Sequence, residues 1–149
     1  MYPHDMGLRM TLPCACTTVR KSGRSLLRYY EEAMIGTGVT ITQFAILRAL
    51  NRNGATPLTD LAAELVMERT SLYRTLAPLE QAGHVTIENA PKGRTKIAEL
   101  TPSGRTIMGE AAPNWEAAQS VVMSAIGEDR WADLSQLLLD IPKILETRP

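Results

Sequence analysis

The chain has 149 residues, of which 44% are hydrophobic and 5% aromatic, so we expect one domain with an aliphatic core, alone or with an oligomerisation arm. No apolar run approaches the roughly 18 residues of a membrane span, and the first residues lack a signal-peptide pattern, which predicts a cytoplasmic protein without membrane contact. The zero net charge argues weakly against nucleic-acid binding. However, the charge is unevenly distributed: residues 1–39 have five basic and three acidic side chains, residues 40–105 have eight and six, and residues 106–149 have three and seven. The excess of acidic side chains therefore lies in the C-terminal segment, which can be held away from DNA.

The first helix is expected from about Cys16 to Ile35, after a flexible tail at residues 1–12. Its apolar residues recur at a spacing near 3.6, as on one face of a helix. The second helix has a clear start signal, because Thr40 and Gln43 match a capping box. It should run to about Asn51.

Two short helices separated by a tight turn are expected after Pro57. Either Thr56 or Thr59 is the expected cap of the first of them. The second should extend over residues 68–82 and turn its leucines inward. Pro78 lies inside it, and since an interior proline costs roughly 3 kcal/mol, we expect a kink there.

A small hairpin with a basic tip is expected next. Gly83 ends the preceding helix, a strand begins at Val85, and a second strand closes at Leu100. The tip, residues 92–96, reads Lys-Gly-Arg-Thr-Lys. The order of helix, turn, helix and hairpin is that of a winged helix-turn-helix, which presents one helix and one hairpin to nucleic acid.

Two long helices are expected at the C-terminal end. Thr101 would cap the first, Pro102 suits its first position, and Pro113 should interrupt or bend it before it ends near Ile126. The last helix, over residues 128–146, is apolar on more than one face and must therefore bury more than one side. We infer that these helices pack against a second copy of the chain.

The predicted fold is therefore mainly α with a small β-hairpin wing (α+β), a winged helix-turn-helix with a dimerisation arm. The expected organisation is a flexible tail at 1–12, an N-terminal dimerisation helix at 13–38, a DNA-binding domain at 39–101 and C-terminal dimerisation helices at 102–149.

Several short motifs, each weak alone, together resemble the MarR family of winged helix-turn-helix transcriptional regulators over roughly residues 13–146. In chain order they are Thr42-Gln43, Leu61-Ala62 with Leu65, Arg69-Thr70-Ser71-Leu72 with Arg74, Leu79-Glu80 with Gly83 and Val85, and Leu100-Thr101-Pro102-Ser103-Gly104. The resemblance implies a homodimer, most often a repressor, that binds double-stranded operator DNA. It also implies a cleft between arm and winged domain that takes small aromatic or phenolic acids as effectors.

The resemblance also implies which residues face DNA. They are Arg69, Thr70, Ser71, Tyr73 and Arg74 on the recognition helix, and Lys92 and Arg94 on the wing. Hydroxyls and helix N-terminal amides suit phosphates, and an exposed arginine can bind guanine bidentately. Tyr73 can instead pack against the wing. The family wing usually carries an acid where this chain has Lys92, so the wing lacks a partner that often steadies it.

The two cysteines resemble those of the organic-hydroperoxide-sensing branch of this family. Alignment on that branch places Cys16 at its reactive cysteine and Tyr30 at a tyrosine that contacts it, with Cys14 as an extra thiol. Redox sensing by Cys16 is therefore an alternative to small-molecule sensing. The other interpretation of Cys16 is a small buried hydrophobe.

The sequence gives little evidence for catalysis or for the binding of a cofactor or metal. The chain has no glycine-rich phosphate loop, no histidine–carboxylate cluster and no set of metal ligands, so we expect no catalytic residues, cofactor or metal. A winged helix used for protein contacts is a further alternative, because the net charge is zero.

Overall fold

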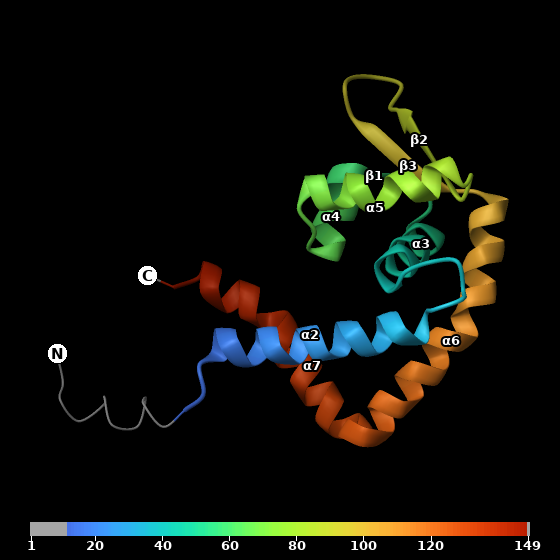
Figure 1. Cartoon of the computed structure of the whole chain (residues 1–149). Coiled ribbons are helices and arrows are strands. Elements are labelled where there is room, and N and C mark those ends of the chain that lie inside the picture. The colour runs from blue at the N-terminus through green and yellow to red at the C-terminus, as the bar shows by residue number, and fades with distance from the viewer. Residues whose placement is uncertain (1–11, 149) are drawn as a thin grey trace.

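A computed structural model describes residues 12–148 (Figure 1). The expected tail lies outside the described residues, apart from Leu12, which is exposed. The elements are α2 (Ala15–Ala33), α3 (Ile41–Asn53), β1 (Thr56–Pro57), α4 (Leu58–Leu65), α5 (Arg69–Gln81), β2 (Val85–Asn89), β3 (Lys96–Leu100), α6 (Pro102–Ile126) and α7 (Glu128–Glu146). The predicted class, mainly helical with a small sheet, is confirmed. None of these helices is long and apolar enough to cross a membrane.

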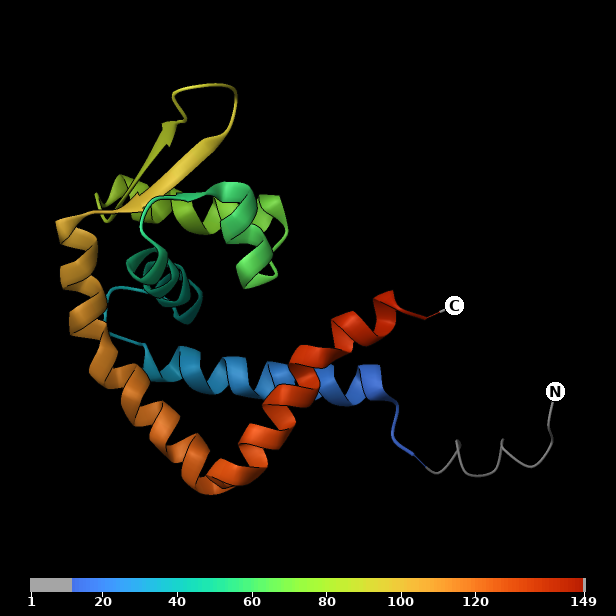
Figure 2. The same ribbon diagram turned by 180° about the vertical axis from the view of Figure 1, so that it is seen from behind.

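The molecule has two parts (Figures 1 and 2). The winged unit consists of α3, α4, α5 and the three strands, and the wing itself is β2, β3 and the loop at residues 90–95. The arm consists of α2, α6 and α7 and extends away from the winged unit. Helix α6 joins the two, since it begins at the root of the wing and packs against both α2 and α3.

The core consists mainly of leucine, isoleucine, valine and alanine, as the scarcity of aromatics predicts, together with Phe44 and Met34. The largest fully buried side chains are Ile46, Leu47, Leu50, Leu61, Leu72, Leu76 and Val85. The predicted capping box is confirmed at the start of α3. The amide of Gln43 donates to Thr40 Oγ1 at 3.1 Å, and the amide of Thr40 donates to Gln43 Oε1 at 2.9 Å. These bonds satisfy two amides that a helix start leaves unpaired.

The sheet has one strand more than the sequence predicts. Its order is β1-β3-β2, with both pairs antiparallel. Strand β1 pairs Thr56 with Ala98 and Pro57 with Ile97. The expected cap of α4 is therefore wrong: the N-cap is Pro57 and no side chain caps the helix. The hydroxyl of Thr56 instead donates to the carbonyl of Gly54 at 2.8 Å.

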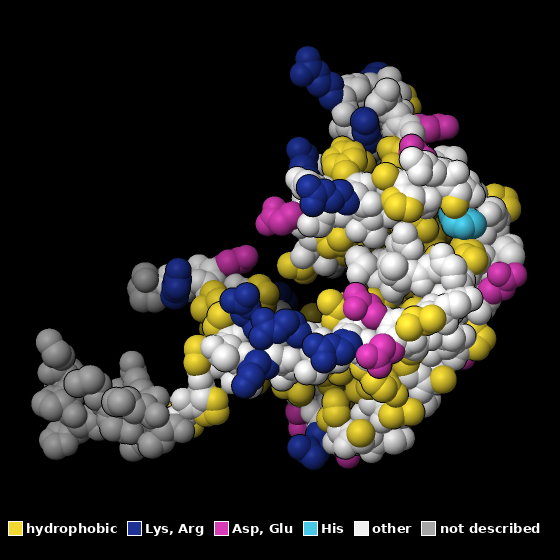
Figure 3. Space-filling view, in the orientation of Figure 1, with side chains coloured by type: hydrophobic (Ala, Val, Ile, Leu, Met, Phe, Trp, Pro, Cys, Tyr) yellow, Lys and Arg dark blue, Asp and Glu magenta, His cyan; other side chains and the backbone are white. Residues whose placement is uncertain are grey.

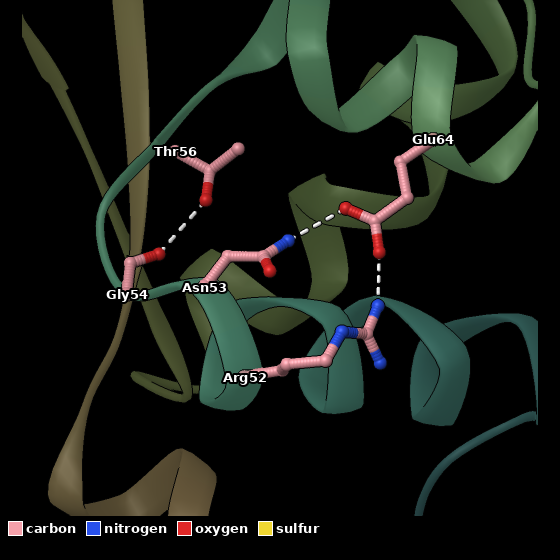
Figure 4. A network of polar contacts seen from close by, with 5 residues as sticks. All are labelled: Arg52, Asn53, Gly54, Thr56 and Glu64. Atoms are coloured by element: carbon pink, nitrogen blue, oxygen red, sulfur yellow. Dashed lines mark hydrogen bonds and ion pairs between the residues drawn. The ribbon is translucent and has the colours of Figure 1, made fainter.

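A polar network connects the end of α3 to α4 (Figure 4). Glu64 accepts hydrogen bonds from Arg52 and from Asn53, the latter at 2.6 Å between Nδ2 and Oε2. The arginine and glutamate side chains are 59% and 34% exposed, so the ion pair contributes at most about 1 kcal/mol. The network adds a polar link between the first helix of the helix-turn-helix and α3.

The long helices continue through their prolines. Helix α5 is unbroken across Pro78, and α6 is unbroken across Pro113, although α6 bends along its length in Figure 1. Helices α2 and α7 have 19 residues each and contain no buried residue. Their exposed large hydrophobic residues include Val19, Leu27, Tyr29, Leu134, Leu137, Leu139, Ile144 and Leu145. An amphipathic helix with no buried face lacks the packing that normally stabilises it.

Candidate nucleic-acid interface

The first two turns of α5 present the predicted recognition residues on the surface. Leu72, Leu76 and Leu79 bury one face of this helix. At about 100° per residue, Thr70 and Arg74 lie opposite that face, whereas Arg69 and Tyr73 lie at its edge on the side of the wing. Those four residues and Ser71 are all exposed. The start of α5 can therefore enter a groove without losing core packing.

A hollow of about 310 Å³ separates the start of α5 from the wing. We call it the α5–wing hollow; it is lined by Leu58, Thr59, Arg69, Leu72, Tyr73, Arg94, Thr95 and Lys96. It brings together three of the predicted site residues, Arg69, Tyr73 and Arg94, from two separate elements. Thr70, Ser71, Arg74 and Lys92 do not line it. Lys96 Nζ lies 5.9 Å from the centroid of the Tyr73 ring, within the range of a cation–π contact.

The tip of the wing is basic and turns at a glycine. Gly93 has a φ of 98°, a conformation in which a side chain would be strained, so this turn favours glycine between Lys92 and Arg94. The amide of Ala90 donates to the carbonyl of Thr95 at 2.7 Å and closes the loop. Lys and Arg side chains gather on the wing and on α5 in the space-filling view (Figure 3).

The root of the wing is joined to the end of α5 by hydrogen bonds. Thr101 Oγ1 donates to the carbonyl of Gly83 at 2.6 Å and accepts from the amide of Gly104 at 3.0 Å, which confirms Thr101 as the cap of α6. His84 Nδ1 lies 2.9 Å from Ser103 Oγ, so this histidine has a structural hydrogen bond. These contacts fix where the wing stands relative to the recognition helix.

A second hollow, of about 370 Å³, lies where the winged unit meets the arm. Its lining comes from α3 and α6: Phe44, Arg48, Asn51, Arg52, Met108, Gly109, Ala112, Trp115 and Glu116. The guanidinium carbon of Arg48 lies 4.2 Å from the centroid of Trp115 and 5.9 Å from that of Phe44. A planar cation beside two aromatic rings suits a small aromatic anion.

The cysteines begin the arm. Both Cys14 and Cys16 are free and exposed, so the interpretation of Cys16 as a buried hydrophobe is wrong for the single chain. Of the two thiols, the structure favours ionisation of Cys14, which has no counterpart in the hydroperoxide-sensing pattern. The backbone amide of Thr17 beside the Cys14 sulfur is the largest cause, and it lowers the pKa of that thiol together with the Thr17 hydroxyl and the amide of Cys16.

Tyr30 does not contact Cys16 within one chain. The two residues are 14 positions apart on α2, which is about 21 Å along a helix axis. The Tyr30 hydroxyl instead donates to Gln119 Oε1 of α6. Partial burial raises the pKa of this phenol, so it stays protonated as that bond requires. A tyrosine–cysteine contact would have to come from a second copy.

An exposed helix start beside a basic β-hairpin, both supported by one aliphatic core, defines a winged helix-turn-helix of the DNA-binding class. Comparison with known proteins agrees. Residues 37–94 match the sequence model of the MarR family. The chain is 26% identical to the HTH-type transcriptional regulator FarR of Neisseria gonorrhoeae over 121 residues, which are 80% of this chain and 83% of FarR.

Solved structures extend the likeness over nearly the whole chain. The M. tuberculosis transcriptional regulator MosR in complex with DNA is 30% identical, with a TM-score of 0.79, covering 90% of this chain and 97% of MosR. Bordetella bronchiseptica BpsR, whose DNA binding is regulated by 6-hydroxynicotinic acid, shares the fold at 19% identity, with a TM-score of 0.75 over 85% of this chain and 96% of BpsR. The chain belongs to the MarR family and is a DNA-binding transcriptional regulator.

Sequence reasoning missed three residues of the α5–wing hollow: Thr59, Thr95 and Lys96. Lys96 follows Arg94 by two positions in the basic tip at residues 92–96, and this clustering of positive charge could have indicated that both belong to one site. No local signal marks Thr59, which reaches the hollow from the start of α4. Among residues 12–148, no three histidine, cysteine or acidic side chains gather as a metal site would require.

Proposed function

We propose that the protein is a homodimeric cytoplasmic repressor that binds a pseudo-palindromic operator and is released by a small-molecule signal. The exposed start of α5 beside the basic wing is the observation that carries this proposal. Arg69, Thr70, Ser71, Tyr73 and Arg74 would face the major groove, and Lys92 and Arg94 would approach the adjacent minor groove. Two such units related by a two-fold axis would bind half-sites about 10 bp apart.

The arm supports the homodimer. Helices α2 and α7 contain no buried residue in the single chain, yet both carry large apolar side chains. Monomeric proteins rarely expose large apolar patches, and a second copy of the arm would cover these side chains. On this proposal residues 13–38 and 102–149 provide the dimerisation helices, and residues 39–101 provide the DNA-binding domain.

Sedimentation of a charged variant tests the dimer. Leu137→Asp places a carboxylate on α7 where the side chain is 56% exposed in the single chain, so it should shift the protein from dimer to monomer. Val66→Asp is the matched control, because Val66 is 91% exposed but lies in the winged unit. If Leu137→Asp sediments as wild type does, α7 is not in the interface.

Selection from random duplexes tests the operator. Duplexes retained by the protein should converge on a pseudo-palindrome, and a promoter carrying that sequence should be transcribed less when the protein is added. Sequence-blind binding in the micromolar range would instead favour a winged helix used for protein contacts. Increased transcription would identify an activator.

The hollow between α3 and α6 supports a small aromatic acid as the effector. Trp115 offers a ring for stacking and Arg48 a cation for the carboxylate, whereas Arg52 is already paired with Glu64. Because the hollow lies between the winged unit and the arm, a ligand there would favour one angle between them over another and so change the spacing of the recognition helices. The regulation of BpsR by 6-hydroxynicotinic acid makes that compound a suitable probe.

Tryptophan fluorescence in a Trp131→Phe background tests this effector site, since Trp115 is then the remaining tryptophan. Addition of 6-hydroxynicotinic acid or benzoate should quench the emission and release the selected DNA. Arg48→Gln should abolish both effects, whereas Arg130→Gln on α7 should not. Equal quenching of the Arg48 variant would place the effector elsewhere.

A thiol sensor is the second candidate, and the lowered pKa of Cys14 favours it. The resemblance to the hydroperoxide-sensing branch instead places Cys16 at the reactive position, two residues further along at the start of α2. Treatment with an organic hydroperoxide should release the DNA from wild type, and Cys14→Ser and Cys16→Ser identify the thiol that responds. If a variant with both cysteines replaced by serine responds as wild type does, the cysteines are not the sensor.

A further inference from the structure

The α5–wing hollow concentrates positive charge from two separate elements. Arg69 comes from α5, and Arg94 and Lys96 come from the wing, yet all three line one hollow of about 310 Å³. No carboxylate of residues 12–148 forms an ion pair with any of them; the ion pair described in this part of the chain joins Arg52 and Glu64. Three cations in one hollow repel one another, so an anion between them is favoured.

The other lining groups suit a tetrahedral oxyanion. Thr59 and Thr95 carry hydroxyls that can donate to phosphate oxygens, and the floor is formed by the buried side chains of Leu58 and Leu72. Charged and hydroxyl donors around an apolar floor can bind an anion with short, charge-assisted hydrogen bonds.

The position of the hollow indicates which anion fills it. On the proposed function, the hollow lies between the helix that faces the major groove of the DNA and the hairpin that faces the minor groove. The sugar-phosphate backbone that separates these two grooves must therefore pass the hollow. We propose that the α5–wing hollow holds one backbone phosphate of each operator half-site, clamped by Lys96 with Arg69, Arg94 and Thr59. This proposal rests on the proposed DNA-binding function and names contacts additional to it.

Lys96 is well placed for this role because its backbone is fixed. It begins β3 and pairs with Asn89, whereas Lys92 lies in the loop beyond the strands. Its ammonium group lies 5.9 Å from the centroid of the Tyr73 ring. We therefore assign Tyr73 as a positioning residue, whose ring holds Lys96 over the hollow instead of contacting a base.

The test combines a protein variant with single neutral phosphates. The selected operator is synthesised as a series of duplexes, each with one phosphate replaced by an uncharged methylphosphonate. For wild type, one phosphate in each half-site should weaken binding roughly tenfold or more when neutralised, as expected for a hydrogen bond to a charged group. Lys96→Met should bind the unmodified duplex more weakly, and neutralising that same phosphate should then have little additional effect.

Lys92→Met is the matched control in the same wing. It should reduce the salt dependence of binding but leave the response to that phosphate as in wild type. Tyr73→Ala should lose the coupling between Lys96 and the phosphate, and Tyr73→Phe, which keeps the ring, should restore it. If Tyr73→Phe behaves like Tyr73→Ala, the ring does not position Lys96.

Two results would overturn the clamp while leaving the DNA-binding function intact. In the first, Lys96→Met shows no coupling to any phosphate although sequence-specific binding persists. In the second, inorganic phosphate binds the hollow at micromolar concentration and displaces DNA at constant ionic strength, which would make a free anion its occupant. Loss of all sequence-specific binding by wild type would instead refute the proposed function itself.

Discussion

Thr101 Oγ1 donates a hydrogen bond of 2.6 Å to the carbonyl of Gly83, and this bond joins the end of the wing to the end of the recognition helix. The same oxygen accepts from the amide of Gly104 at 3.0 Å and so begins α6. One hydroxyl therefore contacts three elements whose relative positions set the DNA-binding surface. The sequence predicts Thr101 only as the cap of α6.

Thr101→Val keeps the shape of this side chain and removes both hydrogen bonds. We expect a loss of about 1–2 kcal/mol in the free energy of unfolding, since a helix cap and a further bond are lost together. Urea denaturation measures it. Thr106→Val is the control, because the Thr106 hydroxyl bonds only to the carbonyl of Pro102 within α6. Equal effects of the two variants would contradict a special role for Thr101.

Gly104 permits the close approach of α6 to the wing root. A Cβ at this position would lie 2.0 Å from the carbonyl oxygen of His84 and 2.6 Å from Leu100 Cδ1. Gly104→Ala should therefore destabilise the fold by about 3 kcal/mol, because backbone must move. Gly109→Ala, in the same helix with nothing within 4 Å, should stabilise it by up to about 1 kcal/mol. Thermal unfolding of the two variants should change in opposite directions.

Val66 ends α4 in a left-handed conformation, with φ 51° and ψ 48°. A β-branched residue is strained there, and with 91% of its surface exposed it gains nothing from burial in the single chain. Val66→Asn should raise the free energy of unfolding by about 1 kcal/mol, since asparagine tolerates this conformation. Val66→Ile, which retains the branch, should bring no gain. A destabilised asparagine variant would show that the strain is offset elsewhere.

Arg74 lies on the face of α5 opposite the buried leucines. If it binds a base, Arg74→Ala should weaken binding to the selected operator about 10- to 100-fold and relax base preference at one position of each half-site. Fluorescence anisotropy against a set of single-base variants measures both. Arg130→Ala on α7 is the control. An Arg74 variant that retains full base preference would exclude base contact.

The Cys14 thiol should ionise at a lower pH than a cysteine in an unfolded chain, because nearby amides stabilise the thiolate. A lowered pKa means more thiolate at a given pH, so alkylation by iodoacetamide should reach half of its maximal rate at a lower pH. The measurement uses Cys16→Ser, folded and in urea. Equal midpoints for the two states would show that the helix start does not activate this thiol.

The sequence alone determined the helices and their order, because the signals are local. A capping box at Thr40 and Gln43, the spacing of Leu72, Leu76 and Leu79, and a cap before Pro102 each act within a few residues. Those patterns sufficed to predict a winged helix-turn-helix, whereas the residues of the recognition helix that face DNA were implied by the resemblance to the MarR family.

The tertiary structure decided what depends on contacts between distant segments. Strand β1 exists because Thr56 and Pro57 reach β3, about 40 residues later, and the hydroxyl of Thr56 bonds to the carbonyl of Gly54 instead of capping α4. The α5–wing hollow arises because Thr59, Arg69 and Lys96 meet there from three separate segments, although the sequence places only Arg69 among the predicted site residues. Likewise, the length of α2 separates Tyr30 from Cys16, so their predicted contact requires a second copy.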